Sequence, residues 1–271
     1  MADERTDSLR ARFPRVLITG AGGQLGTALA EVVPWADALG RGELDVSRHV
    51  PDGYDLILHA AAWTDVDGAE SDPAGAELAN VLGTRNVVAA GAPVVYFSSD
   101  YVFDGSKTEP YVESDRPGPL GVYGRTKLAG EYEVRDGWIV RSSWLFGATG
   151  HNFVRTMLQL AETHDEVAVV DDQRGTPTYV GYFAAAIPLV LDLPYGIYHV
   201  AAGGDCTWAE FAEAIFAETA LSTSVRRITT AELDRPAPRP AYSVLRSELP
   251  ETPRLPHWRL GLGDCLARLD A

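Results

Sequence analysis

The strongest candidates for proton chemistry in the chain are a tyrosine and a lysine four residues apart, Tyr123 and Lys127. Residues at this spacing lie on one face of a helix, so we expect the phenol and the ammonium group side by side. A nearby cation favours the phenolate and lowers the pKa of a tyrosine from its ordinary value of about 10. The pair therefore predicts proton transfer at neutral pH, although the spacing alone is common in helices.

A hydroxyl group earlier in the chain strengthens this prediction. Ser99 and Asp100 follow, after Ser98, the apolar run 93–97, which has the composition of a buried strand. In open α/β sheets, ligands bind beyond the carboxyl ends of the strands. We therefore expect Ser99 to hold a substrate carbonyl group by a hydrogen bond, with Asp100 beside it.

Three glycines with the spacing G-x-x-G-x-x-G, Gly20, Gly23 and Gly26, lie between the apolar run 15–19 and the helical pattern 25–33. Glycine permits a tight turn and a close approach of the backbone, while free N–H groups and the helix dipole face a pyrophosphate. A glycine-rich turn that binds nothing is the alternative. The strand before the loop and the helix after it favour a dinucleotide site.

The elements around these residues alternate between strands and helices. The further strand-like runs are 55–59, 93–97 and 138–141, and the main helical stretches between them are 72–90 and 121–134. Continuous apolar strands that alternate with helices are typical of a parallel sheet covered on both faces. We therefore predict an α/β fold with a doubly wound parallel sheet of the Rossmann type.

The regular alternation of strands and helices becomes less clear after residue 145, which indicates a smaller C-terminal substrate-binding lobe. We assign residues 15–145 to a dinucleotide-binding domain that 179–200 rejoins, and 146–178 with 201–271 to the lobe. Residues 1–14 are expected to be a polar tail. Helices are predicted within the lobe at 152–162 and 207–219, with an extended loop at 234–240.

Composition excludes several classes of protein. The 271 residues carry a net charge of −15, which argues against nucleic-acid binding. No apolar run approaches the roughly 18–20 residues of a membrane span, and the first residues lack the apolar stretch of a secretory signal, so we expect a cytoplasmic protein without a membrane partner. Two cysteines, Cys206 and Cys265, exclude a disulfide scaffold.

No metal site is predicted. The six histidines show no ligand spacing. The acidic pair Asp171 and Asp172 is a weak candidate for Mg²⁺, and a solvated loop is the favoured interpretation.

Taken together, these motifs resemble the extended short-chain dehydrogenase/reductase superfamily and, more narrowly, the dTDP-4-dehydrorhamnose reductase family. The resemblance runs from about residue 15 to the C-terminus, and its motif segments are 20–26, 59–67, 98–105, 122–131, 141–144, 152–153, 172–178 and 239–240. The chain departs from the family's usual pattern at Ser99, where threonine is frequent, and at Trp63, where histidine or tyrosine is frequent. The serine keeps the hydroxyl group, whereas the tryptophan could alter the pocket.

The resemblance implies a role for each matching position. It implies a catalytic trio of Ser99, Tyr123 and Lys127. The cofactor-binding positions that it implies, beside Tyr123 and Lys127, are Gly20, Gly23, Gln24, Leu25, Gly26, Asp45, Val46, Ala60, Ala61, Ala62 and Thr64. The expected substrate-binding positions are Ser99, Asp100, Trp144, Asn152, Phe153 and Arg239. Trp144 and Phe153 fit a role as core aromatic residues equally well.

The segment 39–43 bears on the choice of cofactor. Arg41 favours the 2′-phosphate of NADPH, whereas Glu43 leaves NADH open. The reaction that the resemblance implies is hydride transfer to the C4 carbonyl carbon of a nucleotide-linked 6-deoxy-4-keto sugar, with a dTDP-sugar as the expected substrate.

Two other functions stay open at this point. A nucleotide-sugar 4-epimerase uses the same three residues with tightly held NAD, and some relatives of the family are non-catalytic regulatory subunits that bind NADP. The intact trio favours a reductase. Which sugar, which nucleotide base and whether the chain forms a homodimer are not determined by the sequence.

Overall fold

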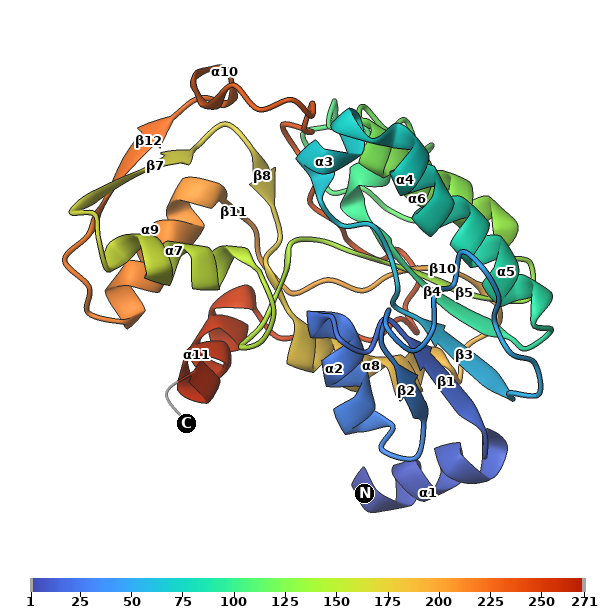
Figure 1. Ribbon diagram of the computed structural model, residues 1–271. Coiled ribbons are helices and arrows are strands. Elements are labelled where there is room, and N and C mark those ends of the chain that lie inside the picture. The colour runs from blue at the N-terminus through green and yellow to red at the C-terminus, as the bar shows by residue number, and fades with distance from the viewer. Residues whose placement is uncertain (1, 270–271) are drawn as a thin grey trace.

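The computed structural model of the chain describes residues 2–269 and has a six-stranded parallel sheet at its centre (Figure 1). The spatial order of the strands is β10-β5-β4-β3-β1-β2. Their bounds are Val16–Thr19 for β1, Asp37–Leu39 for β2, Leu56–His59 for β3, Val94–Ser99 for β4, Gly137–Ser142 for β5 and Gly196–His199 for β10. Every neighbouring pair in this sheet is parallel, which confirms the predicted doubly wound α/β fold.

The strands are apolar throughout because both faces of the sheet are covered. Val16 and Ile18 belong to a hydrophobic cluster that also contains residues of α2 (Gln24–Val32) and α8 (Val180–Val190). Leu17 points to the other face, where it joins a second cluster with Val87. The helices on that side are α3 (Val66–Ser71), α4 (Pro73–Glu77), α5 (Gly83–Ala89) and α6 (Val122–Glu133).

The predicted helix 72–90 is interrupted by one wider turn. Its middle is a π-helical segment, η1 (Leu78–Leu82), between α4 and α5. A π turn inserts an extra residue into the helical ladder and frequently occurs beside functional sites. Here it contains Asn80, whose buried side chain accepts a hydrogen bond from the Trp63 amide at 2.8 Å and donates one to Thr126 Oγ1 at 2.9 Å.

The N-terminal segment differs from the sequence prediction. The expectation of a polar tail over 1–14 is wrong, because Ala2–Arg12 form helix α1. Leu9 and Phe13 lie one turn apart and are buried in the main core, and Trp35 Nε1 donates to the Phe13 carbonyl at 3.0 Å. Two apolar residues in a charged segment are too few to give a recognisable helical periodicity, so the sequence did not predict this helix.

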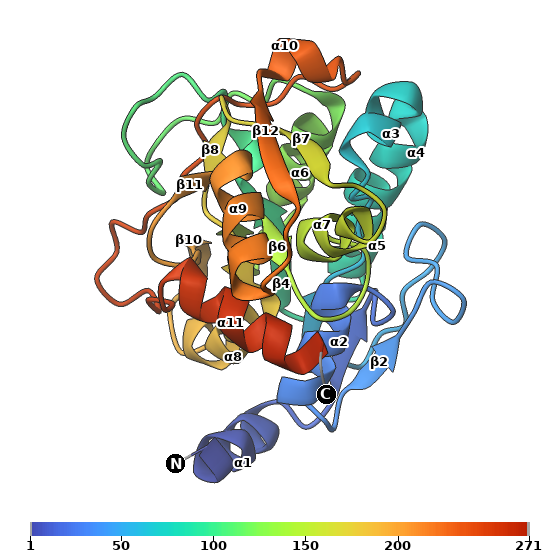
Figure 2. The same ribbon diagram turned by 90° about the vertical axis from the view of Figure 1, so that its left-hand side faces the viewer.

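The C-terminal part packs beside the sheet around a parallel strand pair, β7 (Glu166–Val170) and β12 (Ser224–Ile228) (Figures 1 and 2). The predicted helices in this part are confirmed as α7 (Phe153–Ala161) and α9 (Trp208–Glu218). The Thr207–Glu210 capping box begins α9 as expected. The remaining elements are the short η2 (Asp100–Val102), β6 (Leu145–Phe146), β8 (Arg174–Gly175), β9 (Thr178–Tyr179), β11 (Cys206–Thr207) and α10 (Thr230–Leu233), and the longer helix α11 (Trp258–Leu269).

In the part of the chain that the structure describes, no helix is both long and apolar enough to cross a membrane.

Candidate functional site

The glycine loop between β1 and α2 has the close backbone contacts that the spacing predicts. Gly20 has φ +70°, and a Cβ atom there would lie 2.6 Å from the Ala61 amide nitrogen. A Cβ atom on Gly26 would overlap the Gly20 carbonyl oxygen and lie 2.6 Å from Ala21 Cα. Only glycine at these two positions lets the start of α2 press against the loop.

The N-terminus of α2 fits an anionic ligand. Gly23 is the N-cap and has no side chain to satisfy the first N–H groups of the helix, which are therefore free to bind a phosphate. Gln24 donates from Nε2 to the Leu145 carbonyl at 3.2 Å, while its Oε1 is buried without a hydrogen-bond partner among the described residues. Leu25 packs its side chain into the core, so its backbone alone could serve a cofactor.

The loop after β3 is fixed beside Gly20 by a chain of hydrogen bonds. The Ala61 amide donates to Thr19 Oγ1 at 3.2 Å, and Thr19 Oγ1 lies 2.8 Å from His59 Nδ1. His59 Nε2 lies 3.2 Å from Thr84 Oγ1. Burial, with a smaller effect of the Lys127 charge, lowers the pKa of His59 to about 3, so this histidine is neutral. These hydrogen bonds fix Ala61, which lies between Ala60 and Ala62, while Thr64 is exposed.

The expected adenine end of the site lies beyond β2. Asp45 accepts hydrogen bonds from the Ser47 amide and hydroxyl, which lower its pKa, and Asn86 Nδ2 donates to the Val46 carbonyl at 2.9 Å. Arg41 is exposed in the turn after β2. This position suits a residue that meets the 2′-phosphate of NADPH.

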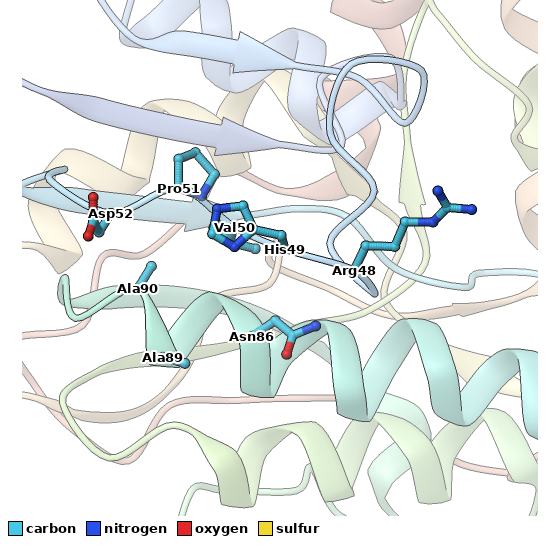
Figure 3. Close-up of a pocket in the computed structure, with 8 residues that line it drawn as sticks. All are labelled: Arg48, His49, Val50, Pro51, Asp52, Asn86, Ala89 and Ala90. Carbon is cyan, nitrogen blue, oxygen red and sulfur yellow. The ribbon is translucent and has the colours of Figure 1, made fainter.

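A hollow of about 350 Å³ lies on this side of the molecule, between the segment 48–52 and α5 (Figure 3). It is lined by Arg48, His49, Val50, Pro51, Asp52, Asn86, Ala89 and Ala90. A second hollow of about 570 Å³ lies over α9, between Arg174 and Arg227. Neither contains a member of the predicted trio, so both are separate from the reacting groups.

The structure brings Ser99 and Tyr123 together. Ser99 ends β4, and Tyr123 lies in the first turn of α6, whose Val122 amide donates to Glu70 Oε1 at 2.6 Å. Burial raises the pKa of Tyr123 to about 12, and the nearby Ser99 hydroxyl opposes that rise. The Tyr101 ring packs edge-on against the phenol with the ring centres 5.8 Å apart. The phenol therefore lies in the neighbourhood of the Ser99 hydroxyl.

Lys127 lies on the same helix but turns toward the sheet. Its Nζ donates to the Phe97 carbonyl at 2.7 Å and lies 4.1 Å from the centre of the Tyr96 ring. Burial lowers the pKa of this lysine to about 7. The expected lowering of the Tyr123 pKa by an adjacent ammonium group is wrong, because the pKa of the phenol is raised and burial is the main cause.

Asp100 is buried directly behind Ser99. It accepts hydrogen bonds from Ser99 Oγ at 3.0 Å and from Ser143 Oγ at 3.1 Å. Burial raises the pKa of this carboxyl group to about 6, although its hydroxyl partners oppose the rise. The structure therefore shows Asp100 as a group that orients Ser99.

An aromatic stack lies on the C-terminal side of the site. Trp144 has φ +48°, a backbone conformation that non-glycine residues rarely adopt, and its indole stacks on that of Trp208 with centres 3.5 Å apart. Phe153 packs against Trp208 at 4.6 Å. Sequence reasoning missed Trp208, although its place directly after the Thr207 N-cap of α9 could have drawn attention to it.

Asn152 has a visible structural role. Its Oδ1 accepts from the Arg155 amide at 3.3 Å as the N-cap of α7, and its Nδ2 donates to the Gly147 carbonyl at 2.8 Å. The residue is 6% exposed. These hydrogen bonds of the Asn152 side chain hold the 147–152 loop in its conformation.

Arg239 lies in the loop just before Tyr242, and its guanidinium group is close to Tyr101. Its guanidinium group makes two hydrogen bonds to Asp67, at 3.0 and 2.8 Å. Burial acts to lower the pKa of Arg239, but Asp67 and the nearby Tyr101 outweigh it and raise this pKa. Arg235 also pairs with Asp67 at 3.0 Å. The role of Asp67 as the partner of two arginines was not recognised in the sequence.

The acidic pair in the 171–178 loop is engaged by other side chains. Asp171 accepts from Thr207 Oγ1 at 2.6 Å and pairs with Arg227 at 3.1 Å, while Asp172 accepts from Thr230 Oγ1 at 2.6 Å. Within residues 2–269, no three histidine, cysteine, aspartate or glutamate side chains gather as a metal site would require.

Comparison with known proteins places this geometry in a family. Residues 14–271 match the family model for the RmlD substrate binding domain. The chain is 41% identical to the spore coat polysaccharide biosynthesis protein SpsK of Bacillus subtilis, over 93% of this chain and 96% of that protein. It is 40% identical to the dTDP-4-dehydrorhamnose reductase of Streptomyces griseus, over 94% of each chain.

Solved structures agree with these sequence matches. The crystal structure of dTDP-4-dehydrorhamnose reductase from Bacillus anthracis in complex with NADP superposes with a TM-score of 0.88 and 36% identity, covering 94% of this chain and 99% of that one. The resemblance seen in the motifs is thereby confirmed over nearly the whole length. This chain belongs to the dTDP-4-dehydrorhamnose reductase family.

Proposed function

We propose that this protein reduces the C4 keto group of a dTDP-linked 6-deoxy-4-keto sugar with NADPH, converting dTDP-4-dehydro-L-rhamnose to dTDP-L-rhamnose. The observation that carries the proposal is the meeting of Ser99 and Tyr123 at the carboxyl end of β4, with Lys127 one turn along α6. Relatives named for this reaction cover most of the chain.

Tyr123 is suited to the role of general acid. With a pKa of about 12 it is protonated at neutral pH, and the alkoxide that forms on reduction of a ketone is a stronger base than a phenolate. The proton transfer is therefore downhill, and general acid catalysis of this kind contributes ~10²–10⁴-fold. Ser99 would orient the carbonyl oxygen toward the phenol, and Asp100 holds the Ser99 hydroxyl.

The cofactor would be held by the glycine loop and the N-terminus of α2 at its pyrophosphate, by the 60–62 loop, and by Lys127 at the nicotinamide ribose. When bound, NADPH supplies the hydride that reduces the sugar. Arg41 is the residue that we propose for the 2′-phosphate, and the related reductase with NADP bound supports this preference. The clash that a side chain at Gly20 or Gly26 would cause agrees with a loop kept open for a cofactor.

The sugar nucleotide would lie against the C-terminal lobe, residues 146–178 and 201–271. Trp144, Phe153 and Trp208 offer aromatic surfaces for stacking on the sugar or the base. We propose that Arg239 binds the diphosphate of the sugar nucleotide while it keeps its ion pair with Asp67. Location in the cytoplasm and assembly as a homodimer stay predictions.

Incubation of the purified chain with NADPH and dTDP-4-dehydro-L-rhamnose tests the function. We expect one NADPH consumed for each dTDP-L-rhamnose formed, as followed by NADPH absorbance and by NMR of the product. An epimerase would change the sugar without net consumption of NADPH, and a regulatory subunit would bind NADPH and change nothing. Either result would refute the proposal, and parallel assays with other 4-keto sugars and bases would define the specificity.

A further inference from the structure

Helix α6 carries a third ionisable residue on the face of Tyr123 and Lys127. Glu131 follows Lys127 by four residues, so it lies one turn further along the same face. Lys127 and Glu131 are each only 3% exposed. A carboxylate at this depth requires compensation, and the proposed reaction gives it no role so far.

Three donors hold the Glu131 carboxylate in place. Arg141, on β5, makes two parallel hydrogen bonds to it, from Nε at 2.9 Å and from Nη2 at 2.7 Å, and Ser98 Oγ donates to Oε1 at 2.5 Å. Both side chains of this ion pair are 2% exposed. A buried pair with satisfied hydrogen bonds keeps its charges, because removal of either partner would leave the other uncompensated. The remaining terminal nitrogen of Arg141, Nη1, is hydrogen-bonded to His199 Nε2 at 3.4 Å.

The other titratable groups that face Lys127 are neutral. On β4, burial raises the pKa of Tyr96 well above its ordinary value. On β3, His59 has a pKa of about 3, and on α6 itself Tyr123 has a pKa of about 12. Burial favours the uncharged amine of Lys127, and the negative charge of Glu131 opposes this effect.

We propose that Glu131 is a positioning residue of the reductase site, whose buried carboxylate favours the ammonium form of Lys127 over the neutral amine. The inference deepens the proposed function and rests on it for the role of Lys127 toward the cofactor. An ammonium group has three N–H donors. The Phe97 carbonyl takes one of them, which leaves two for a pair of ribose hydroxyls. Arg141 and Ser98 hold the Glu131 carboxylate in the position from which it favours the ammonium form of Lys127.

The chain offers a direct measurement, because Lys107 and Lys127 are its only lysines. NMR titration of protein labelled with ¹³C at lysine Cε gives one signal for each, and Lys107, which pairs with Asp115 in a distant loop, is an internal reference. In Glu131→Gln we expect the titration midpoint of Lys127 to fall by about one unit below the wild-type value. In Arg141→Gln, which exposes the full charge of Glu131, we expect it to rise.

The opposite signs separate a charge effect from a structural one. A loosened interior would move Lys127 toward the value of a free lysine, about 10.4, in both variants. Glu133→Gln, near the end of the same helix where Glu133 pairs with Arg85, is the matched control and should leave the midpoint unchanged. A midpoint in folded Glu131→Gln equal to or above the wild-type value would overturn the proposal. If that variant does not fold, an unshifted midpoint in Arg141→Gln would do so.

Binding of NADP⁺, followed by quenching of tryptophan fluorescence, gives a second measurement. Because one pKa unit corresponds to a tenfold change, Glu131→Gln should weaken NADP⁺ binding about tenfold at pH 8 and only about twofold at pH 6. Equal weakening at both pH values would contradict the charge role. Absence of sugar turnover by the wild-type protein would refute the proposed function, whereas the lysine titration would still decide the role of Glu131.

Discussion

At the scale of single residues, the site separates groups that meet the reacting atoms from groups that hold them. Tyr123 lies near enough to Ser99 for the serine hydroxyl to influence its pKa, while Asp100 lies behind the serine and accepts its hydrogen bond. The raised pKa of Tyr123 keeps the phenol protonated, which is the form that a reductase needs for its acid.

Tyr123→Phe should therefore lower turnover about 10²–10⁴-fold, because the general acid is lost and little else changes. Affinity for NADPH, measured by fluorescence titration, should stay within about twofold of the wild type. Tyr132→Phe is the control, since Tyr132 lies on the same helix and is 73% exposed. Turnover by the Tyr123 variant at the wild-type rate would remove this residue from the mechanism.

The aromatic stack gives a second expectation at this scale. Trp208→Ala removes the surface on which Trp144 rests at 3.5 Å. Stacking on an aromatic ring contributes about 0.5–1.5 kcal/mol beyond the buried area, so we expect the KM for the sugar nucleotide to rise up to about tenfold. The Kd for NADPH, measured on the same variant, should not change. An unchanged KM would place the sugar away from this stack.

At the scale of elements, the sequence was informative where one residue type decides the local structure. The strands were recognisable because both faces are buried, and the glycine spacing located the turn before α2. The direction of Lys127 could not be predicted, because a four-residue spacing determines a helix face and not whether a long side chain turns to a neighbour or to the sheet. The roles of Trp208 and Glu131 depend on their contacts with Trp144 and Arg141, which lie on other elements and meet them only in the folded chain.

Gly26→Ala tests the contact between α2 and the glycine loop. The added Cβ atom would lie 2.6 Å from Ala21 Cα, so the helix must move away from the loop. Overpacking of this kind costs about 1–3 kcal/mol, and we expect a lower melting temperature with at least tenfold weaker NADPH binding. In Gly22→Ala the new atom meets nothing within 4 Å, so the melting temperature should be retained. Equal melting temperatures for the two variants would contradict this account of the loop.

At the scale of the whole molecule, buried ionisable groups link the two sides of the site. His59 connects Thr19, before the glycine loop, with Thr84 on α5, and it stays neutral because burial lowers its pKa to about 3. The unfolded chain protonates this histidine near its ordinary pKa of 6.5. The stability that the neutral form contributes is therefore complete above pH 6.5 and is lost as the pH falls toward 3.

His59→Gln removes this dependence. Between pH 7 and pH 5 the wild type should lose about 2 kcal/mol of unfolding free energy relative to the variant, while other titrating groups contribute equally to both proteins. Urea unfolding at the two pH values gives the four free energies. A difference between the proteins that does not change with pH would show that folding leaves the pKa of His59 unshifted, which would contradict its burial as a neutral group.

The proposed reaction requires that hydride passes directly from the cofactor to the sugar in this site. The most direct measurement uses NADPH deuterated at the transferred position of its nicotinamide, with dTDP-4-dehydro-L-rhamnose and mass spectrometry of the product. We predict one deuterium, located at C4 of the sugar, for each NADPH oxidised. A product without deuterium, or unconsumed NADPH beside an intact 4-keto sugar, would contradict the account.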